Sequence, residues 1–177
     1  GASELAVGDT ITGFMGEPGD LTGATLGIYS RNSVHMLYGS SSADWNLIQY
    51  REEIGAFDYS IQQFGTTVFL DDRGITNLQT VQAYGNFQHA TISTHIQRVI
   101  NDKKTLIAAS CIARDKNQFR LFFSDGYGLY ITTAGRKVTG IMPVQFPNPV
   151  RCIFSLEDAA GNEVIKYGSD DGFVYQV

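Results

Sequence analysis

One strand–turn–strand pattern occurs twice in the C-terminal half of the chain, and it restricts the fold more than any other feature. The segment from Cys111 reads CIARDKNQFRLFFSDGYGLYIT, and the segment from Cys152 reads CIFSLEDAAGNEVIKYGSDDGFVYQV. Both begin with Cys-Ile, pass through a polar turn, and then give a strand, a turn with Ser-Asp and Gly, and another strand. The cysteines lie 41 residues apart and the Ser-Asp turns 45 residues apart, because the second segment has a longer first turn. Such a period indicates a repeat architecture.

Two weaker copies of the hairpin precede these segments. TTVFLDDRGITNLQ places Asp-Asp-Arg-Gly (71–74) between apolar arms, and LGIYSRNSVHMLYG places Ser-Arg-Asn (30–32) in the same way. The four turns are centred near residues 31, 72, 125 and 170, at spacings of about 40 to 53 residues. One such unit holds three or four strands of about five to eight residues, the size of a β-propeller blade. The sequence therefore predicts an all-β fold with about four propeller-type blades in a single domain over residues 1–177.

The residues inside each unit support the assignment of strands and turns. In QFRLFF, large apolar residues occupy positions 119, 121 and 123 and alternate with Arg120 and Phe122, which predicts a strand with one more apolar face. Asp followed by Gly between such arms is a hairpin signal, because glycine reaches positive φ without steric cost and Asp tolerates it. We expect structural roles for six turn residues: Asp72, Gly74, Asp125, Gly126, Asp171 and Gly172.

One segment has a helical period instead. In ATISTHIQRVINDKKT, apolar residues occupy positions 92, 96, 99 and 100, the spacing of a stripe along one helix face. Thr94, followed three residues later by Gln97, matches a capping box. The pattern predicts a short amphipathic helix between about Ser93 and Asp102, inserted between two blades. We expect this helix to pack over the flank of the blades, with contact to a neighbouring subunit as the alternative.

Charge and apolar composition argue against two classes of partner. The net charge of −5 leaves no electrostatic footprint for nucleic acid. No apolar run approaches the roughly 18 residues of a membrane-spanning helix. Cys111 and Cys152 have no CxxC spacing, so we expect two buried thiols, with a disulfide or a metal site as the less supported alternatives.

The sequence shows no recognisable set of catalytic residues. The three histidines, His35, His89 and His95, are scattered, GxSxG is absent, and His95 has no partner at i+4 that would complete a metal pair. The Ser-Asp-Gly turns are similar to the Asp-box of sialidases, Ser-x-Asp-x-Gly-x-Thr-Trp, but they differ in register and lack Thr-Trp. Turn geometry alone demands Asp and Gly at these positions. We therefore expect no enzymatic activity, no cofactor and no bound metal.

The run KNQFRLFFSDGYGLYIT, followed by GIMPV and then by YGSDDGFVYQ, resembles the propeller region of virion structural proteins from tailed bacteriophages. These are the tail-nozzle or head–tail stabilisation proteins of short-tailed phages and related prophages. The resemblance is best from Ala108 to Val177, looser from Gly65 to Thr105, and before that it depends on the spacing of the blades. It implies a non-enzymatic role in the virion tail, assembled in the bacterial host cytoplasm. The implied partners are copies of the same chain in a ring and the neighbouring tail or adaptor proteins.

Two questions stay open at the level of sequence. In phage proteins of this kind the propeller is one part of a longer chain, so the last hairpin is expected to be an interior blade of a larger propeller. The rival hypothesis is a complete four-bladed propeller, in which Glu4 to Phe14 supplies the strand missing after Val177. For function, the alternative is a glycan-binding propeller for host attachment, with Trp45 at a blade edge as a candidate contact residue. A degenerate glycosidase-like propeller is a further alternative.

Overall fold

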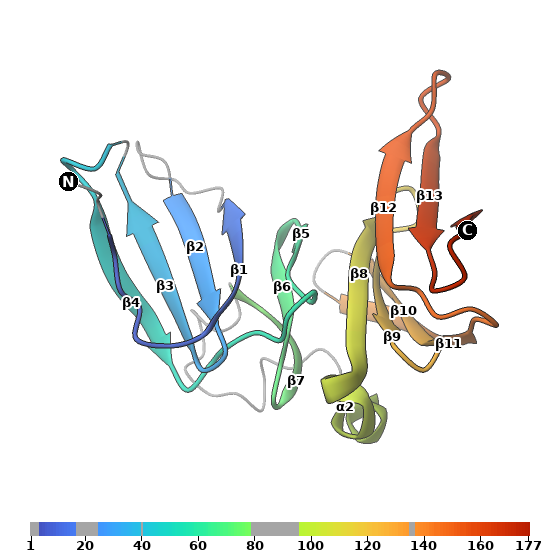
Figure 1. Ribbon diagram of the computed structural model, residues 1–177, viewed down its shortest axis with the longest axis horizontal. Helices are drawn as coiled ribbons and strands as arrows, with labels where there is room; N and C mark the ends of the chain where they lie inside the picture. The colour runs from blue at the N-terminus through green and yellow to red at the C-terminus, as the bar shows by residue number, and fades with distance from the viewer. Residues whose placement is uncertain (1–3, 17–24, 40, 79–95, 135–136) are drawn as a thin grey trace.

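The computed structural model describes residues 4–16, 25–39, 41–78, 96–134 and 137–177. Within these residues the chain forms four antiparallel sheets and one short α-helix (Figure 1). The predicted all-β class is confirmed, and the described strands form no closed barrel. No helix in the described part of the chain is long and apolar enough to cross a membrane.

Each sheet is a meander in which strands that follow one another in sequence pair with one another. The first sheet contains β1 (Ile11–Gly16), β2 (Thr25–Ser30), β3 (Ser33–Tyr38) and β4 (Asn46–Glu52). The second contains β5 (Gln62–Phe64), β6 (Thr66–Asp71) and β7 (Gly74–Asn77). The third contains β8 (Ile107–Ala113), β9 (Gln118–Phe123), β10 (Tyr127–Ala134) and β11 (Lys137–Gln145). The fourth contains β12 (Cys152–Glu157), β13 (Glu163–Gly168) and β14 (Val174–Gln176).

The four hairpins predicted from sequence occupy the same place in each sheet. Every one of them joins the second strand to the third: β2 to β3, β6 to β7, β9 to β10, and β13 to β14. The turn glycines 126 and 172 have φ of 84° and 81°, the left-handed conformation that favours glycine. The first strands also lie together, since β8 contacts both β5 and β12. The chain therefore repeats one unit of three or four strands four times.

Consecutive sheets pack face to face through three apolar clusters. Between the first and second sheets, the rings of Tyr29 and Phe69 lie 5.2 Å apart. Between the second and third sheets, Val68 and Leu70 of β6 pack with the apolar side chains at positions 119, 121 and 123 of β9. Between the third and fourth sheets, Phe122 lies in a cluster with Ile165 and Tyr167 of β13 and with Ala109 and Cys111 of β8. The second and third sheets therefore bury both of their faces.

The burial of β9 differs from the sequence-based expectation of one more apolar face. Arg120 is only 1% exposed and Phe122 is fully buried, because the fourth sheet covers the face on which they lie. Arg120 donates from Nε and Nη2 to the Oε1 of Gln118, at 3.0 and 2.8 Å. Its guanidinium lies 4.0 Å from the centroid of the Tyr130 ring. A cation can occupy this interior position because an amide oxygen and an aromatic face receive it.

A carboxylate also links the third and fourth sheets. Glu163, at the start of β13, accepts hydrogen bonds from the backbone N–H groups of Arg114 and Asp115, at 2.9 and 3.1 Å, and from the Ser155 hydroxyl at 2.5 Å. Burial opposes the ionisation of Glu163, but these bonds and the positive charge of Arg120 together hold its pKa below the usual value. The two sheets are thus joined by charge-assisted hydrogen bonds as well as by apolar contact.

The helix is confirmed from residue 97 onward. Helix α2 (Gln97–Lys103) is followed directly by the 3-10 turn η3 (Lys104–Leu106) and then by β8. Ile100 is fully buried in the cluster between the second and third sheets, so the helix packs on the sheets as expected. Thr94 lies outside the described residues, and the N-cap position is Ile96, which makes no side-chain cap. The side chain of Gln97 instead donates to Asn101 Oδ1, at 3.1 Å.

Two other expectations need correction. Strand β1 pairs with β2, with Phe14 opposite Ile28, so Glu4 to Phe14 does not add a strand to the fourth sheet. Strands that are neighbours in sequence pair readily, and here β1 pairs with its neighbour β2 instead of with the fourth sheet. Both cysteines are free thiols, but only Cys111 is buried, and burial raises its pKa to about 11. Cys152 is exposed because no described sheet packs on its face of the fourth sheet.

Alanine substitutions at the turn glycines should lower the unfolding free energy by different amounts. A Cβ at Gly126 would lie 2.7 Å from the carbonyl oxygen of Phe146, whereas a Cβ at Gly172 would meet nothing within 4 Å. We expect Gly172→Ala to cost about 1 kcal/mol of unfolding free energy from backbone strain alone, and Gly126→Ala to cost about 2 to 3 kcal/mol. Urea denaturation measures both. The control is Gly140→Ala, at an open position of β11 without positive φ; equal stability of all three variants would contradict the turn assignment.

Candidate functional site: the turn face and the central cavity

The second-to-third turn of every sheet lies against the segment that leads into the first strand of the same sheet. Antiparallel strands alternate in direction, so the two features fall at the same end of each sheet. A backbone hydrogen bond joins them in all four sheets: Arg31 N to Thr10 O (2.9 Å), Phe57 N to Leu70 O (2.9 Å), Ser124 N to Leu106 O (2.7 Å) and Arg151 N to Gly168 O (2.9 Å). We call these turns and entry segments together the turn face.

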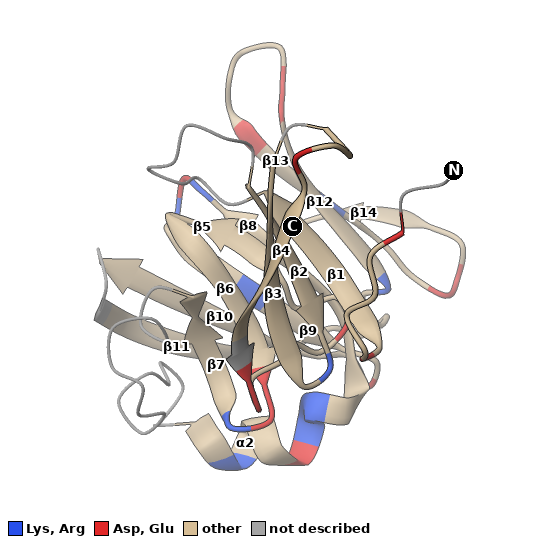
Figure 2. Cartoon of the chain, turned by 90° about the vertical axis from the view of Figure 1, so that its left-hand side faces the viewer, with Lys and Arg blue, Asp and Glu red and all other residues tan. Residues whose placement is uncertain are grey.

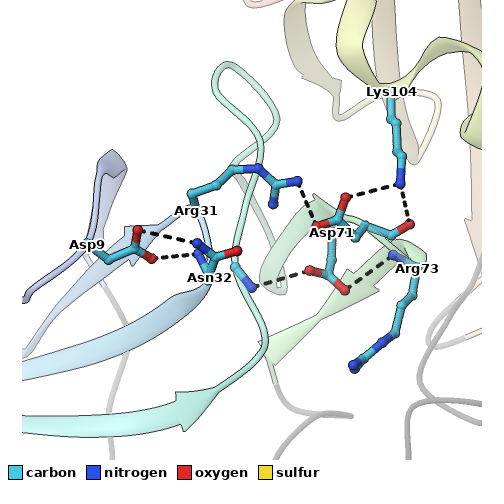
Figure 3. Close-up of polar contacts among 8 residues, drawn as sticks. Asp9, Arg31, Asn32, Asp71, Arg73 and Lys104 are labelled. Carbon is cyan, nitrogen blue, oxygen red and sulfur yellow. Dashed lines mark hydrogen bonds and ion pairs between the residues drawn. The ribbon is translucent and has the colours of Figure 1, made fainter.

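Charged residues of both signs pair with one another on the turn face, and Figure 2 marks the positions of Lys, Arg, Asp and Glu along the backbone. The carboxylate of Asp72, in the β6–β7 turn, accepts hydrogen bonds from Arg31 Nη2 at 2.7 Å and from Lys104 Nζ at 3.0 Å (Figure 3). Lys104 Nζ also donates to the backbone oxygen of Asp72, at 3.0 Å. Partial burial opposes the ionisation of Asp72, but the bonds from Lys104 and Arg31 outweigh it and lower its pKa. This network connects the first, second and third sheets.

Asp71, the residue before, has the opposite environment. Its side chain is buried and accepts hydrogen bonds from the backbone N–H groups of Gly55 at 3.3 Å and Arg73 at 3.4 Å (Figure 3). Burial is the largest effect on this carboxyl group and raises its pKa. Asp71 therefore fixes the backbone inside the turn, whereas Asp72 pairs with cations outside it.

The remaining turns repeat the arrangement with different residues. Asp125 forms an ion pair with Lys103 of α2 and accepts from Tyr127 N at 3.1 Å, and these bonds outweigh partial burial and lower its pKa. Asp170 is held by Arg151, which donates from Nε to Oδ1 at 2.8 Å and from Nη2 to Oδ2 at 2.6 Å. In the first sheet the carboxylate lies in the entry segment and its donor lies in the turn. Asp9 precedes β1 and accepts a hydrogen bond from the Asn32 backbone N–H at 2.7 Å (Figure 3).

The six turn residues predicted from sequence thus have distinct environments. Asp72 and Asp125 pair with cations, whereas Asp171 accepts from Phe173 N and from the Tyr175 hydroxyl inside its own turn. Gly74, Gly126 and Gly172 all have positive φ. Sequence reasoning missed the basic partners, which lie in a predicted turn (Arg31), at the end of the helical segment (Lys103 and Lys104) and directly before β12 (Arg151). These partners are Arg31, Lys103, Lys104 and Arg151.

A cavity of about 390 Å³ lies where the first strands of all four sheets meet. Its lining comes from residues 12–14 of β1, from 59, 61 and 62 at the entry to β5, from 108–110 of β8 and from 151–153 at the start of β12. Inside it, Gln62 Nε2 donates to the backbone oxygen and the hydroxyl of Ser110, both at 3.1 Å. The Ser110 hydroxyl in turn donates to the backbone oxygen of Tyr59. No local pattern marks these residues, because their proximity depends on how the sheets stack.

The other candidate residues from sequence lie elsewhere. His35 is buried in β3, and His89 and His95 lie outside the described residues. Trp45 precedes the edge strand β4 in an exposed turn, as expected, and does not line the cavity. In the described ranges, no three His, Cys, Asp or Glu side chains are grouped as metal ligands. Three turn carboxylates, Asp72, Asp125 and Asp170, pair with Lys or Arg, an arrangement suited to holding turns in place.

No protein-family model matches the chain, and no curated protein matches it. The function is therefore inferred from the residues and from the geometry of the turn face, the cavity and the outer sheet faces.

The Asp72 network makes a prediction for acid conditions. Its carboxyl pKa is lowered on folding, so its contribution to stability is present above the unfolded Asp pKa of about 3.9 and is lost as pH falls through the lower folded value. We expect Asp72→Asn to reduce the unfolding free energy by about 0.5 to 1 kcal/mol at pH 7, since the pair is partly exposed and screened by solvent. The deficit should shrink below about pH 4 and in 1 M salt.

Thermal and urea unfolding at pH 7 and pH 3 measure this difference. Asp102→Asn is the matched control, because Asp102 is an exposed carboxylate on α2. A deficit for Asp72→Asn that stays the same at both pH values would show that the network does not depend on the ionised carboxylate.

Proposed function

We propose that this chain is a non-enzymatic structural protein with propeller-type blades that acts through protein–protein contacts in the tail of a bacteriophage virion. The observation that carries the proposal is the apolar outer face of the fourth sheet. That face is exposed and carries Phe154 and Val174, with the polar Lys166 and Gln176 across the strands from Phe154. The resemblance of residues 108–177 to tail-nozzle and head–tail stabilisation proteins supplies the biological setting.

Three features of the fold support a propeller-type arrangement. The chain repeats one meander four times, and successive meanders stack face to face. The first strand of every sheet contributes to one common cavity, as the innermost strands of blades do around a central channel. The turn face then gathers the second-to-third turns of all the sheets at one end of the molecule.

The outer face of the fourth sheet is built from alternate residues of its strands. Ile153, Tyr167 and Tyr175 are opposite one another and pack toward the third sheet. The intervening positions point away from it, and among them Phe154 is 68% and Val174 is 73% exposed. Large apolar side chains gathered on one sheet face are typical of surfaces that a partner covers.

Under this proposal the partners are copies of the same chain in a ring and the neighbouring tail or adaptor proteins, and the location is the virion tail. Rigid sheets with exposed apolar faces suit such assembly, because they bury area on contact without first having to become ordered. Any glycan contact would be a separate property of the same domain.

Replacing the apolar outer face with charge should abolish association. We expect the parent chain to self-associate with increasing concentration in sedimentation velocity, and Phe154→Lys combined with Val174→Lys to remain monomeric, because lysine opposes burial of the face. Met142→Lys is the matched control, since Met142 is exposed on β11 at the edge of the third sheet. Association that is lost equally in the control, or unchanged in the double variant, would count against this face as the contact surface.

The virion assignment has its own test. Purified particles from the phage or prophage that encodes the chain should contain its peptides at several copies per tail, as quantified by mass spectrometry against the major tail protein. Detection of the protein in the host lysate but not in the particles would refute the assignment, whatever the result for the outer face.

A further inference from the structure

Two exposed aromatic rings stand at the central cavity. Tyr59 is 68% exposed and Phe14 is 57% exposed, and both belong to the lining. Phe14 comes from β1 and Tyr59 from the segment that leads into β5, so the rings are supplied by different sheets. Exposed rings beside a concave surface are typical of small-molecule sites, where an aromatic face supplies most of the contact area.

The backbone of Tyr59 is held in an unfavourable conformation. Its φ of 62° is in the left-handed region, where residues other than glycine are strained. The next residue is fixed firmly, because Ser60 Oγ donates to Phe57 O at 2.7 Å and accepts from Leu70 N at 3.1 Å. From the third sheet, the Ser110 hydroxyl donates to Tyr59 O. These bonds hold the residue so that its ring stays in solvent at the cavity.

The polar groups of the cavity are hydroxyls and amides with little net charge. Thr12, Gln62 and Ser110 contribute hydroxyl and carboxamide groups from three different strands. Among the described lining residues, Arg151 is the one charged side chain, and its guanidinium is already paired with both carboxylate oxygens of Asp170. A neutral ligand therefore suits the cavity better than an anion, and one with hydroxyl groups suits it better than a purely apolar one.

From this combination we propose that the cavity is a binding site for the ring of a neutral carbohydrate. A pyranose presents an apolar C–H face, which stacks on the Tyr59 ring, and equatorial hydroxyls, which reach the polar groups of Gln62 and Thr12. The cavity volume of about 390 Å³ is within the range of small-molecule sites. Phe154 and Val174 do not line the cavity, so a test of the site is independent of the assembly function.

Saturation-transfer NMR with neutral disaccharides tests the site directly. The probes are maltose, cellobiose, lactose and chitobiose, each titrated against the parent chain. We expect saturation transfer from the protein to at least one of them. Tyr59→Gly should weaken that binding about tenfold, because it removes the stacking ring. Glycine also relieves the positive φ, so this variant keeps the fold, and unfolding cannot explain the loss.

Three further variants make the outcome specific. Tyr59→Phe retains the ring and should bind within about twofold of the parent. Trp45→Ala and Phe173→Ala each remove an exposed aromatic ring outside the cavity and should leave binding unchanged. The proposal is overturned if none of the four disaccharides shows saturation transfer. It is also overturned if binding survives in Tyr59→Gly or is lost in Trp45→Ala.

Discussion

Burial of both faces of the two middle sheets is the constraint on which the rest of the structure depends. Side chains alternate across a strand, so the nearly continuous apolar runs of β6 and β9 need another sheet on each side. Face-to-face stacking supplies it, and stacking in turn brings the four first strands to one cavity and the four second-to-third turns to one end. The cavity and the turn face are consequences of this packing, with Arg31, Asp72 and Lys104 holding three sheets together at one side.

Polar chemistry in the molecule acts mainly to hold sheets and turns in register. On the turn face, cations from entry segments pair with turn carboxylates, which lowers the pKa of those acids. Arg120 is buried and bonds to Gln118 of its own strand, whereas the half-buried Glu163 joins the fourth sheet to the third through its bonds from the backbone of Arg114 and Asp115. The central cavity differs, because its polar groups come from several sheets and lie beside exposed aromatic rings. Gln62 and Ser110 of the cavity also bond the second sheet to the third, whereas the exposed rings of Phe14 and Tyr59 remain accessible to a ligand.

Features determined by a few neighbouring residues were predictable from the sequence. The four hairpins follow from period-two patterns and from Asp and Gly at the turns, and α2 follows from its apolar stripe. Features that depend on contacts between sheets were not predictable. The exposure of Cys152 and the burial of Arg120 both depend on which faces meet. The cavity is the extreme case, since Phe14, Tyr59 and Ser110 are far apart in sequence and carry no shared motif.

The meander topology also determines the order in which the protein can fold. Every described strand pairs only with a neighbour in sequence, so each sheet closes short loops and loses little chain entropy in doing so. The slow, long-range events are the stacking of finished sheets and the joining of their turns. A chain that emerges from the ribosome can therefore complete one sheet before the next is synthesised. Each new sheet then packs on the apolar face of the preceding one, so folding proceeds from the first sheet to the fourth.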